Sequence, residues 1–230
     1  MKEIALNLKS MQDYRINESY KQLRTNIEFS GEENKIIAVT SCTPSEGKST
    51  VSLSTAYSLA EAGKKVLFID ADLRKSVLTG RYKISGEMKG LTHFLSGQGD
   101  LSEILCKTNE KGLFVIFAGP VPPNPAELLG SKKFAALLKE ARNIYDYIII
   151  DTPPLGSVID SAIVSAVCDA AILVISANTI SYKFARSVKD QLAKTGCNIL
   201  GVVLNKVSMK QNKYYGKCYG KYYGHYGSDK

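Results

Sequence analysis

Six short apolar runs, rich in β-branched residues and separated by segments long enough for a helix, constrain the fold of this chain most strongly. We predict strands at 35–41, 66–70, 115–117, 147–151, 170–175 and 199–204, and helices at 17–29, 48–62, 131–143 and 183–194. Strands that alternate with helices form a parallel sheet covered on both faces. With 230 residues, 44% of them hydrophobic, the chain suits one α/β domain rather than two.

The segment SCTPSEGKST at 41–50 lies between a predicted strand and a predicted helix. A phosphate-binding loop needs this context, because backbone N–H groups at the helix start attract phosphate oxygens. Lys48 can reach the β- and γ-phosphates, and the Ser49 hydroxyl can ligate Mg²⁺. Cys42 replaces the usual glycine, but GKST in this context still predicts a nucleotide site. Its predicted residues are Pro44, Ser45, Glu46, Gly47, Lys48, Ser49 and Thr50, with Asn205 as a contact to the adenine edge.

Carboxylates follow two of the predicted strands directly. Asp70 and Asp72 end one strand, and Asp151 ends another. Ligands of parallel sheets bind at the carboxyl ends of the strands, so we expect these side chains to meet the phosphate loop. Asp70 or Asp72 could hold magnesium or accept a proton, and a carboxylate at the position of Asp151 usually orients a magnesium-bound water.

Six of the chain's 13 tyrosines lie in its last seventeen residues, among glycines and lysines. Such a segment cannot build a core, so we predict a domain at 1–206 followed by a flexible tail at 207–230. ATP chemistry beside an array of phenols suggests a kinase that phosphorylates its own tail. The predicted acceptors are Tyr214, Tyr215, Tyr219, Tyr222, Tyr223 and Tyr226.

The net charge of +8 is concentrated near the end of the chain. From Lys206 onward there are six lysines and one aspartate, a formal charge of +5. A basic tail could bind an anionic membrane surface or an acidic active site. A basic stripe across a folded face would instead indicate a nucleic-acid partner. Because no apolar run reaches about 18 residues and no signal peptide is apparent, we expect a cytosolic protein.

The first helix carries Glu18, Lys21 and Arg24 along one slanted stripe. By itself this pattern is typical of a solvated helix face with a weak internal salt bridge.

Taken together, these features resemble the bacterial protein-tyrosine kinases of capsule and exopolysaccharide synthesis, in their short cytoplasmic Gram-positive form. The resemblance is carried by the phosphate loop with Pro44, VLFIDADLR at 66–74, PPNPAELL at 122–129, IIIDTPP at 148–154 and the tyrosine cluster. It implies a single-domain P-loop NTPase of the deviant Walker, MinD/ParA-like type, with a mostly parallel sheet, helices on both faces and a disordered C-terminal tail.

The resemblance also implies roles for the site residues. Lys48 and Ser49 would hold phosphate and Mg²⁺, Asp72 and Asp151 would support the metal, and Asp70 would be the base. The stripe of Glu18, Lys21 and Arg24, within a helical segment at 1–30, would contact other subunits, although the family prefers arginine where Lys21 stands. Ser76 replaces a common proline, and we expect little consequence.

The activity implied is ATP-dependent, non-specific protein-tyrosine kinase activity, with autophosphorylation in trans and control of polysaccharide synthesis and chain length. The implied partners are a transmembrane activator that recruits the kinase to the inner membrane face, further copies in an oligomer such as a ring, a phosphotyrosine phosphatase and polysaccharide enzymes as substrates. No nucleic-acid partner is expected.

Two other functions fit parts of the pattern. A partition or positioning ATPase that binds DNA or membrane would carry a lysine where Thr43 stands. A scaffold without enzymatic activity would bind nucleotide and present its tyrosines to another kinase. An iron–sulfur reductase is disfavoured, because the five cysteines stand at the wrong places.

Overall fold

The structure is a computed structural model that describes residues 2–7, 13–82 and 88–208. It contains the strands β1 (Lys2–Ile4), β2 (Ile36–Ser41), β3 (Val66–Asp70), β4 (Leu105–Thr108), β5 (Leu113–Ile116), β6 (Tyr147–Asp151), β7 (Ala170–Ser176) and β8 (Asn198–Asn205). The helices are α1 (Tyr14–Glu28), α2 (Lys48–Glu61), α3 (Leu78–Arg81), α4 (Leu91–Leu95), α5 (Leu101–Ile104), α6 (Pro125–Leu129), α7 (Lys132–Ala141), α8 (Asp160–Ser165) and α9 (Tyr182–Ala193).

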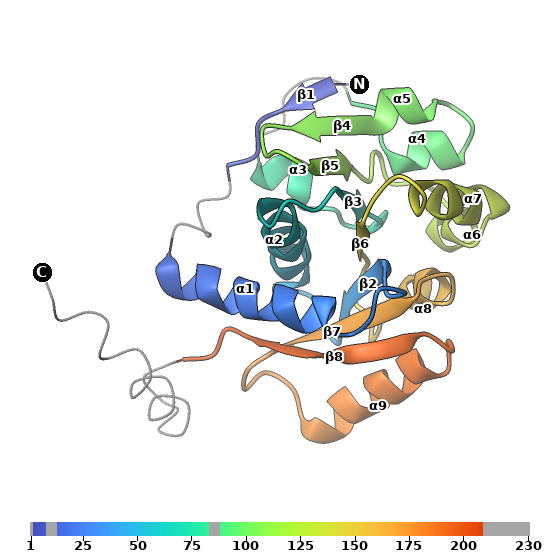
Figure 1. The fold of residues 1–230 in the computed structure, drawn as a ribbon. Helices are drawn as coiled ribbons and strands as arrows, with labels where there is room; N and C mark the ends of the chain where they lie inside the picture. The colour runs from blue at the N-terminus through green and yellow to red at the C-terminus, as the bar shows by residue number, and fades with distance from the viewer. Residues whose placement is uncertain (1, 8–12, 83–87, 209–230) are drawn as a thin grey trace, which may run out of the picture.

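The eight described strands form one sheet in the order β1-β4-β5-β3-β6-β2-β7-β8 (Figure 1). Every neighbouring pair is parallel except β4 and β5, which run antiparallel. The mostly parallel α/β sheet expected from the sequence is therefore confirmed. The six predicted strands are all present, whereas β1 and β4 at one edge of the sheet were not anticipated.

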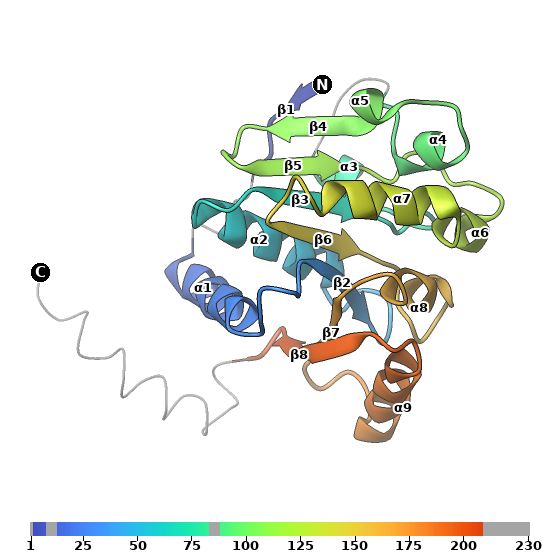
Figure 2. The same cartoon turned by 45° about the vertical axis from the view of Figure 1, so that its right-hand side comes forward.

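Helices cover both faces of the sheet (Figures 1 and 2). Successive residues of β2 point to opposite sides, so Ile36 and Ala38 join one buried cluster while Ile37 and Val39 join the other. The first cluster lies under α7, α8 and α9, and the second under α1 and α2. Because both faces are buried, the central strands are continuous apolar runs rather than alternating ones.

Parallel pairing brings the polar ends of the central strands together. Asp70 at the end of β3 is the direct partner of Asp151 at the end of β6, and Asp151 also pairs with Val39 of β2. The loop after β2 and the start of α2 lie at the same edge of the sheet. The strand order thus gathers side chains that are about a hundred residues apart in the chain.

Candidate active site

The phosphate loop connects β2 to α2 and takes a left-handed backbone at two positions. Gly47 has φ of 91° and Ser45 has φ of 66°. A side chain at Gly47 would also collide with its surroundings, since an added Cβ would lie 2.1 Å from Nδ2 of Asn205. No side chain caps the first turn of α2, so the N–H groups there can bind an anion.

Hydrogen bonds from the ends of β7 and β8 hold the phosphate loop in place. The buried Glu46 carboxylate accepts hydrogen bonds from the backbone N–H of Thr43 (2.8 Å) and of Ser176 (3.2 Å). The Asn205 amide donates to the Glu46 carbonyl (2.8 Å), and the Lys206 ammonium donates to the Ser45 carbonyl (2.6 Å). Glu46 is therefore a loop anchor, and the Asn205 amide contacts the loop itself.

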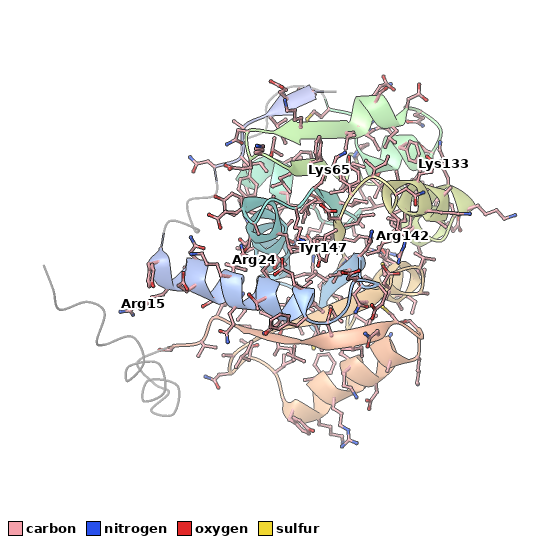
Figure 3. All side chains as sticks on the ribbon, in the orientation of Figure 1. Arg15, Arg24, Lys65, Lys133, Arg142 and Tyr147 are labelled. Carbon is pink, nitrogen blue, oxygen red and sulfur yellow. The ribbon has the colours of Figure 1, made fainter. Side chains whose placement is uncertain are left out.

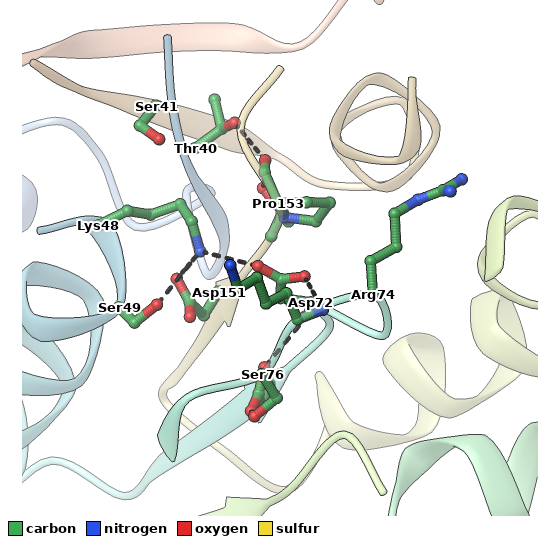
Figure 4. Close-up of polar contacts among 12 residues, drawn as sticks. Thr40, Ser41, Lys48, Ser49, Asp72, Arg74, Ser76, Asp151 and Pro153 are labelled. Atoms are coloured by element: carbon green, nitrogen blue, oxygen red, sulfur yellow. Dashed lines mark hydrogen bonds and ion pairs between the residues drawn. The ribbon is translucent and has the colours of Figure 1, made fainter. Parts of the chain in front are cut away.

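Lys48 lies at the centre of the acidic cluster. Its ammonium is 2.8 Å from Oδ1 of Asp151 and 3.9 Å from Oδ2 of Asp72, and it points toward Asp151 and Ser49 (Figure 4). The side chains of Lys48 and Asp151 are only 6% and 1% exposed. Ser52, one helical turn after Lys48, also donates to Asp151 Oδ1 (3.0 Å). The structure thus brings together the loop lysine and the three aspartates predicted from the sequence.

Asp70 is a buried carboxyl beside a like charge. Burial raises its pKa to about 7, and the neighbouring Asp151 carboxylate contributes to this rise. The Ser76 hydroxyl donates a 2.5 Å hydrogen bond to Asp70 Oδ2, which favours the ionised form. The hydroxyl of Ser76 thus contacts the predicted base, and the expectation that serine at this position has little consequence stays a prediction.

The donor set suits a magnesium ion that is shared with phosphate. Oδ2 of Asp151 is buried and has no hydrogen-bond partner, so its lone pairs are free to bind a cation. Across the ranges 2–7, 13–82 and 88–208, no three His, Cys, Asp or Glu side chains form a metal cage by themselves. Mg²⁺ typically uses one or two carboxylates together with substrate phosphates, which fits these residues.

Three further polar contacts at this edge were not anticipated. Arg74 pairs with Asp160 at 2.7 and 2.9 Å, and the Arg81 guanidinium donates to the Thr50 hydroxyl (2.7 Å). Ser52 reaches Asp151 as described above. Only Ser52 had a signal in the sequence, because residues four apart share a helix face.

The stripe on α1 makes contacts within the chain. Lys21 pairs with Glu18 at 2.8 Å, as the local reading of the pattern anticipated. Arg24 lies where α1 meets α2 and donates to the Ser58 carbonyl (2.7 Å) and hydroxyl (Figure 3). A role of this stripe in oligomerisation stays a prediction.

The predicted tyrosine acceptors in 214–226 lie outside the described residues. Within the residues described, no helix has the length and apolar character needed to cross a membrane.

Comparison with known proteins identifies the family. Residues 34–199 match the family described as AAA domain. The chain is 51% identical over 191 residues to the tyrosine-protein kinase CpsD of Streptococcus agalactiae serotype Ia, covering 83% of this chain and 82% of that protein. It is 40% identical over 201 residues to the tyrosine-protein kinase YwqD of Bacillus subtilis, covering 86% and 84%.

Solved structures agree with this assignment. The crystal structure of the chimerical protein CapA2B2 superposes with a TM-score of 0.82 at 30% identity, covering 90% of this chain and 93% of the other. The septum site-determining protein MinD of Pyrococcus horikoshii, complexed with Mg-ADP, matches with a TM-score of 0.65 at 26% identity, over 77% and 72%. The predicted deviant Walker fold is thereby confirmed, and the chain belongs to the bacterial tyrosine-protein kinases.

Proposed function

We propose that this kinase uses ATP and Mg²⁺ to phosphorylate its own tyrosines Tyr214, Tyr215, Tyr219, Tyr222, Tyr223 and Tyr226. The observation that carries the proposal is the position of β8. Its last residue, Asn205, and the following Lys206 both hydrogen-bond to the phosphate loop. The tyrosine-bearing segment 207–230 therefore continues from a point next to the phosphate loop.

The roles we assign follow from the contacts. Lys48 and the free N–H groups of α2 hold the β- and γ-phosphates, and Ser49, Asp72 and Asp151 hold the metal ion. When bound, Mg²⁺ neutralises charge on the phosphates. Lys48, which pairs with Asp151 at 2.8 Å, would contact the phosphate oxygens when nucleotide is bound, and Asp151 would then be available to the metal ion.

Asp70 acts as the base. A tyrosine hydroxyl has a pKa of about 10 and is a weak nucleophile at neutral pH. As the phenol oxygen forms its bond to the γ-phosphorus, the bond from that phosphorus to the bridging oxygen of ADP breaks, and the phenol proton passes to the Asp70 carboxylate. A base whose pKa lies near the working pH suits this transfer.

The test is intact mass after incubation of the purified chain with ATP and Mg²⁺, with an activator peptide present. Stepwise phosphate additions that map to the six tyrosines are expected. A chain that gains no phosphate on these residues would refute the proposal.

We infer that transfer occurs in trans. A flexible segment of 10–15 residues spans roughly 16–23 Å, which is enough for its own site or a neighbour's. Mixing a Lys48→Met subunit with a tail-deleted active subunit separates the two routes. Phosphate on the Lys48→Met tail is expected, and an unmodified tail excludes transfer in trans.

Phosphorylation should also control assembly. Each phosphotyrosine adds about −1.5 to −2 charges, so full modification reverses the +5 of the tail. An unmodified tail binds the acidic site of another subunit, and a modified one is repelled. Size-exclusion mass measurement before and after ATP–Mg²⁺ tests this, and an unchanged oligomer after full modification contradicts it.

The biological setting we propose is capsular or exopolysaccharide synthesis and control of its chain length. A transmembrane chain-length protein would recruit the kinase to the inner membrane face and activate it through its cytoplasmic end. A phosphotyrosine phosphatase would reset the tail, and polysaccharide enzymes are further substrates. The domain would comprise 1–206, with an oligomerisation segment at 1–30. Measuring kinase activity with and without the partner's cytoplasmic peptide tests the activation step.

A further inference from the structure

Arg74 and Asp160 form a two-point ion pair beside the site. Arg74 Nε lies 2.7 Å from Asp160 Oδ2, and its terminal Nη2 lies 2.9 Å from Oδ1. The Asp160 side chain is fully buried, whereas the Arg74 side chain is 42% exposed. Paired hydrogen bonds of this kind fix both distance and orientation, which a lysine cannot do.

The pair joins the two segments that carry the catalytic aspartates. Arg74 stands two residues after Asp72 in the loop that follows β3. Asp160 is the first residue of α8, in the segment that follows Asp151 and β6. These two loops come from neighbouring strands, yet 86 positions separate the paired residues.

The loop after β3 is hydrogen-bonded around its own carboxylates. The Asp72 N–H donates to Asp70 Oδ1 (3.2 Å), and the Lys75 N–H donates to Asp72 Oδ1 (3.0 Å). Ser76 closes the loop by donating to Asp70 Oδ2. Arg74 lies inside this loop, so its guanidinium connects the loop to Asp160.

The other end of the pair is equally well attached to the sheet. Ser161, next to Asp160, donates a short hydrogen bond to the Pro153 carbonyl. The Thr40 hydroxyl donates to the same carbonyl at 3.0 Å. Pro153 lies two residues after Asp151, so the start of α8 is connected to the strand end that carries Asp151.

Arg74 does not face the position where phosphate would bind. Its side chain extends away from the contact between Lys48 and Asp151 (Figure 4). Such a pair is expected to add little net stability to the fold, because the cost of desolvating the buried carboxylate offsets much of the attraction between the two charges.

We infer that Arg74 and Asp160 are a positioning pair that sets the spacing between the carboxylates of Asp70 and Asp72 and that of Asp151. This inference rests on the proposed roles of those three aspartates. The pair aligns the base and the metal-supporting groups with the phosphate loop, which it does not touch itself. Its loss slows phosphate transfer and leaves nucleotide binding nearly intact.

The experiment measures kcat and the KM for ATP of tail phosphorylation in the full-length chain, with activator peptide, for Arg74→Gln, Arg74→Lys, Asp160→Asn and the double replacement of both. Losing an outer partner of a metal-supporting group typically lowers activity by about 10–100-fold, and we expect that loss in kcat for Arg74→Gln. The KM should change by less than about threefold, because only the aligned transition state loses support. Arg74→Lys should fall in between, since it keeps the charge without the paired geometry.

Arg142→Gln is the matched control. Arg142 pairs with Asp169 at 2.6 Å, and Asp169 also accepts from the N–H groups of Lys35 and Ile36 at the start of β2. This second Arg–Asp pair therefore lies where the strands begin, whereas the site lies where they end. A purely structural effect would appear in both variants, whereas a positioning effect lowers kcat only at Arg74.

Circular dichroism and urea unfolding establish that each variant is folded. If Arg74→Gln unfolds because Asp160 is left buried and unpaired, the double replacement takes its place, since it removes both charges. Folded variants with kcat within about twofold of the wild type, or an equal loss in Arg142→Gln, would overturn the inference alone. A wild-type chain that transfers no phosphate in this assay would overturn the proposed function, and this inference with it.

Discussion

Lys48 provides the sharpest test of the electrostatics of the site. Its replacement by methionine keeps an unbranched side chain and removes the one ammonium that faces Asp151 at 2.8 Å. Asp151, 1% exposed, then keeps only the Ser52 hydroxyl at 3.0 Å. The acidic cluster loses the cation that its members share.

The size of the effect follows from the burial of both partners. Removing one member of a buried pair costs about 3–5 kcal/mol, because the remaining charge is left without a partner. That is a large share of a total stability of about 5–15 kcal/mol. Replacing both, as Lys48→Met with Asp151→Asn, removes the unpaired charge and should restore most of the loss.

The assay is urea unfolding at pH 8 without nucleotide or Mg²⁺, followed by far-UV circular dichroism because the chain has no tryptophan. With a slope of about 3 kcal/mol per molar urea, the single replacement should lower the midpoint by about 1–1.7 M. The control is Lys107→Met, which removes an exposed pair with Glu3 and should leave the midpoint unchanged. A single variant with the wild-type midpoint, or a double variant as unstable as the single one, would refute the reasoning.

Three further predictions test the core, the phosphate loop and the buried Asp70 carboxyl. Phe134→Ala, in a fully buried position, should cost about 3–5 kcal/mol in thermal or urea unfolding. Gly47→Ala combines a left-handed φ of 91° with a Cβ collision, so calorimetry should show ADP binding weakened about tenfold or more, with an unchanged circular dichroism spectrum. Folding raises the pKa of Asp70 to about 7, so the metal-free folded chain binds an extra proton between about pH 4 and 7. Wild-type stability should therefore fall as pH rises through this window, and Asp70→Asn should flatten the decline; equal slopes would contradict it.

Local pattern was enough to locate the central strands and the phosphate loop. The strands β2, β3, β6 and β7 are continuous apolar runs, because helices cover both faces of the sheet, whereas β8 at the sheet edge is an apolar run that stays partly exposed. Asp70 and Asp151 could be placed together without coordinates, since parallel strands bring their carboxyl ends to one edge. The GKST segment could be recognised because the strand before it and the helix after it are its sequence neighbours, although residues from the ends of β7 and β8 hold the loop in place.

The edge strands show where local pattern is insufficient. The strands β1 and β4 have three and four residues, too few for a periodic signal. They pair in parallel with each other, and β4 runs antiparallel to β5. Partners about a hundred positions apart, such as Lys2 and Cys106, are brought together only by the tertiary fold.

Within the site, the sequence by itself was enough to propose which groups carry the chemistry, namely the loop lysine and three carboxylates. The tertiary structure alone decided how these groups are held. Glu46 turned out to anchor the loop, Ser76 to bind Asp70, and Arg74 to reach Asp160. Such contacts depend on where the loop backbones bring their side chains, and residues as far apart as 74 and 160 leave no periodic trace in the chain.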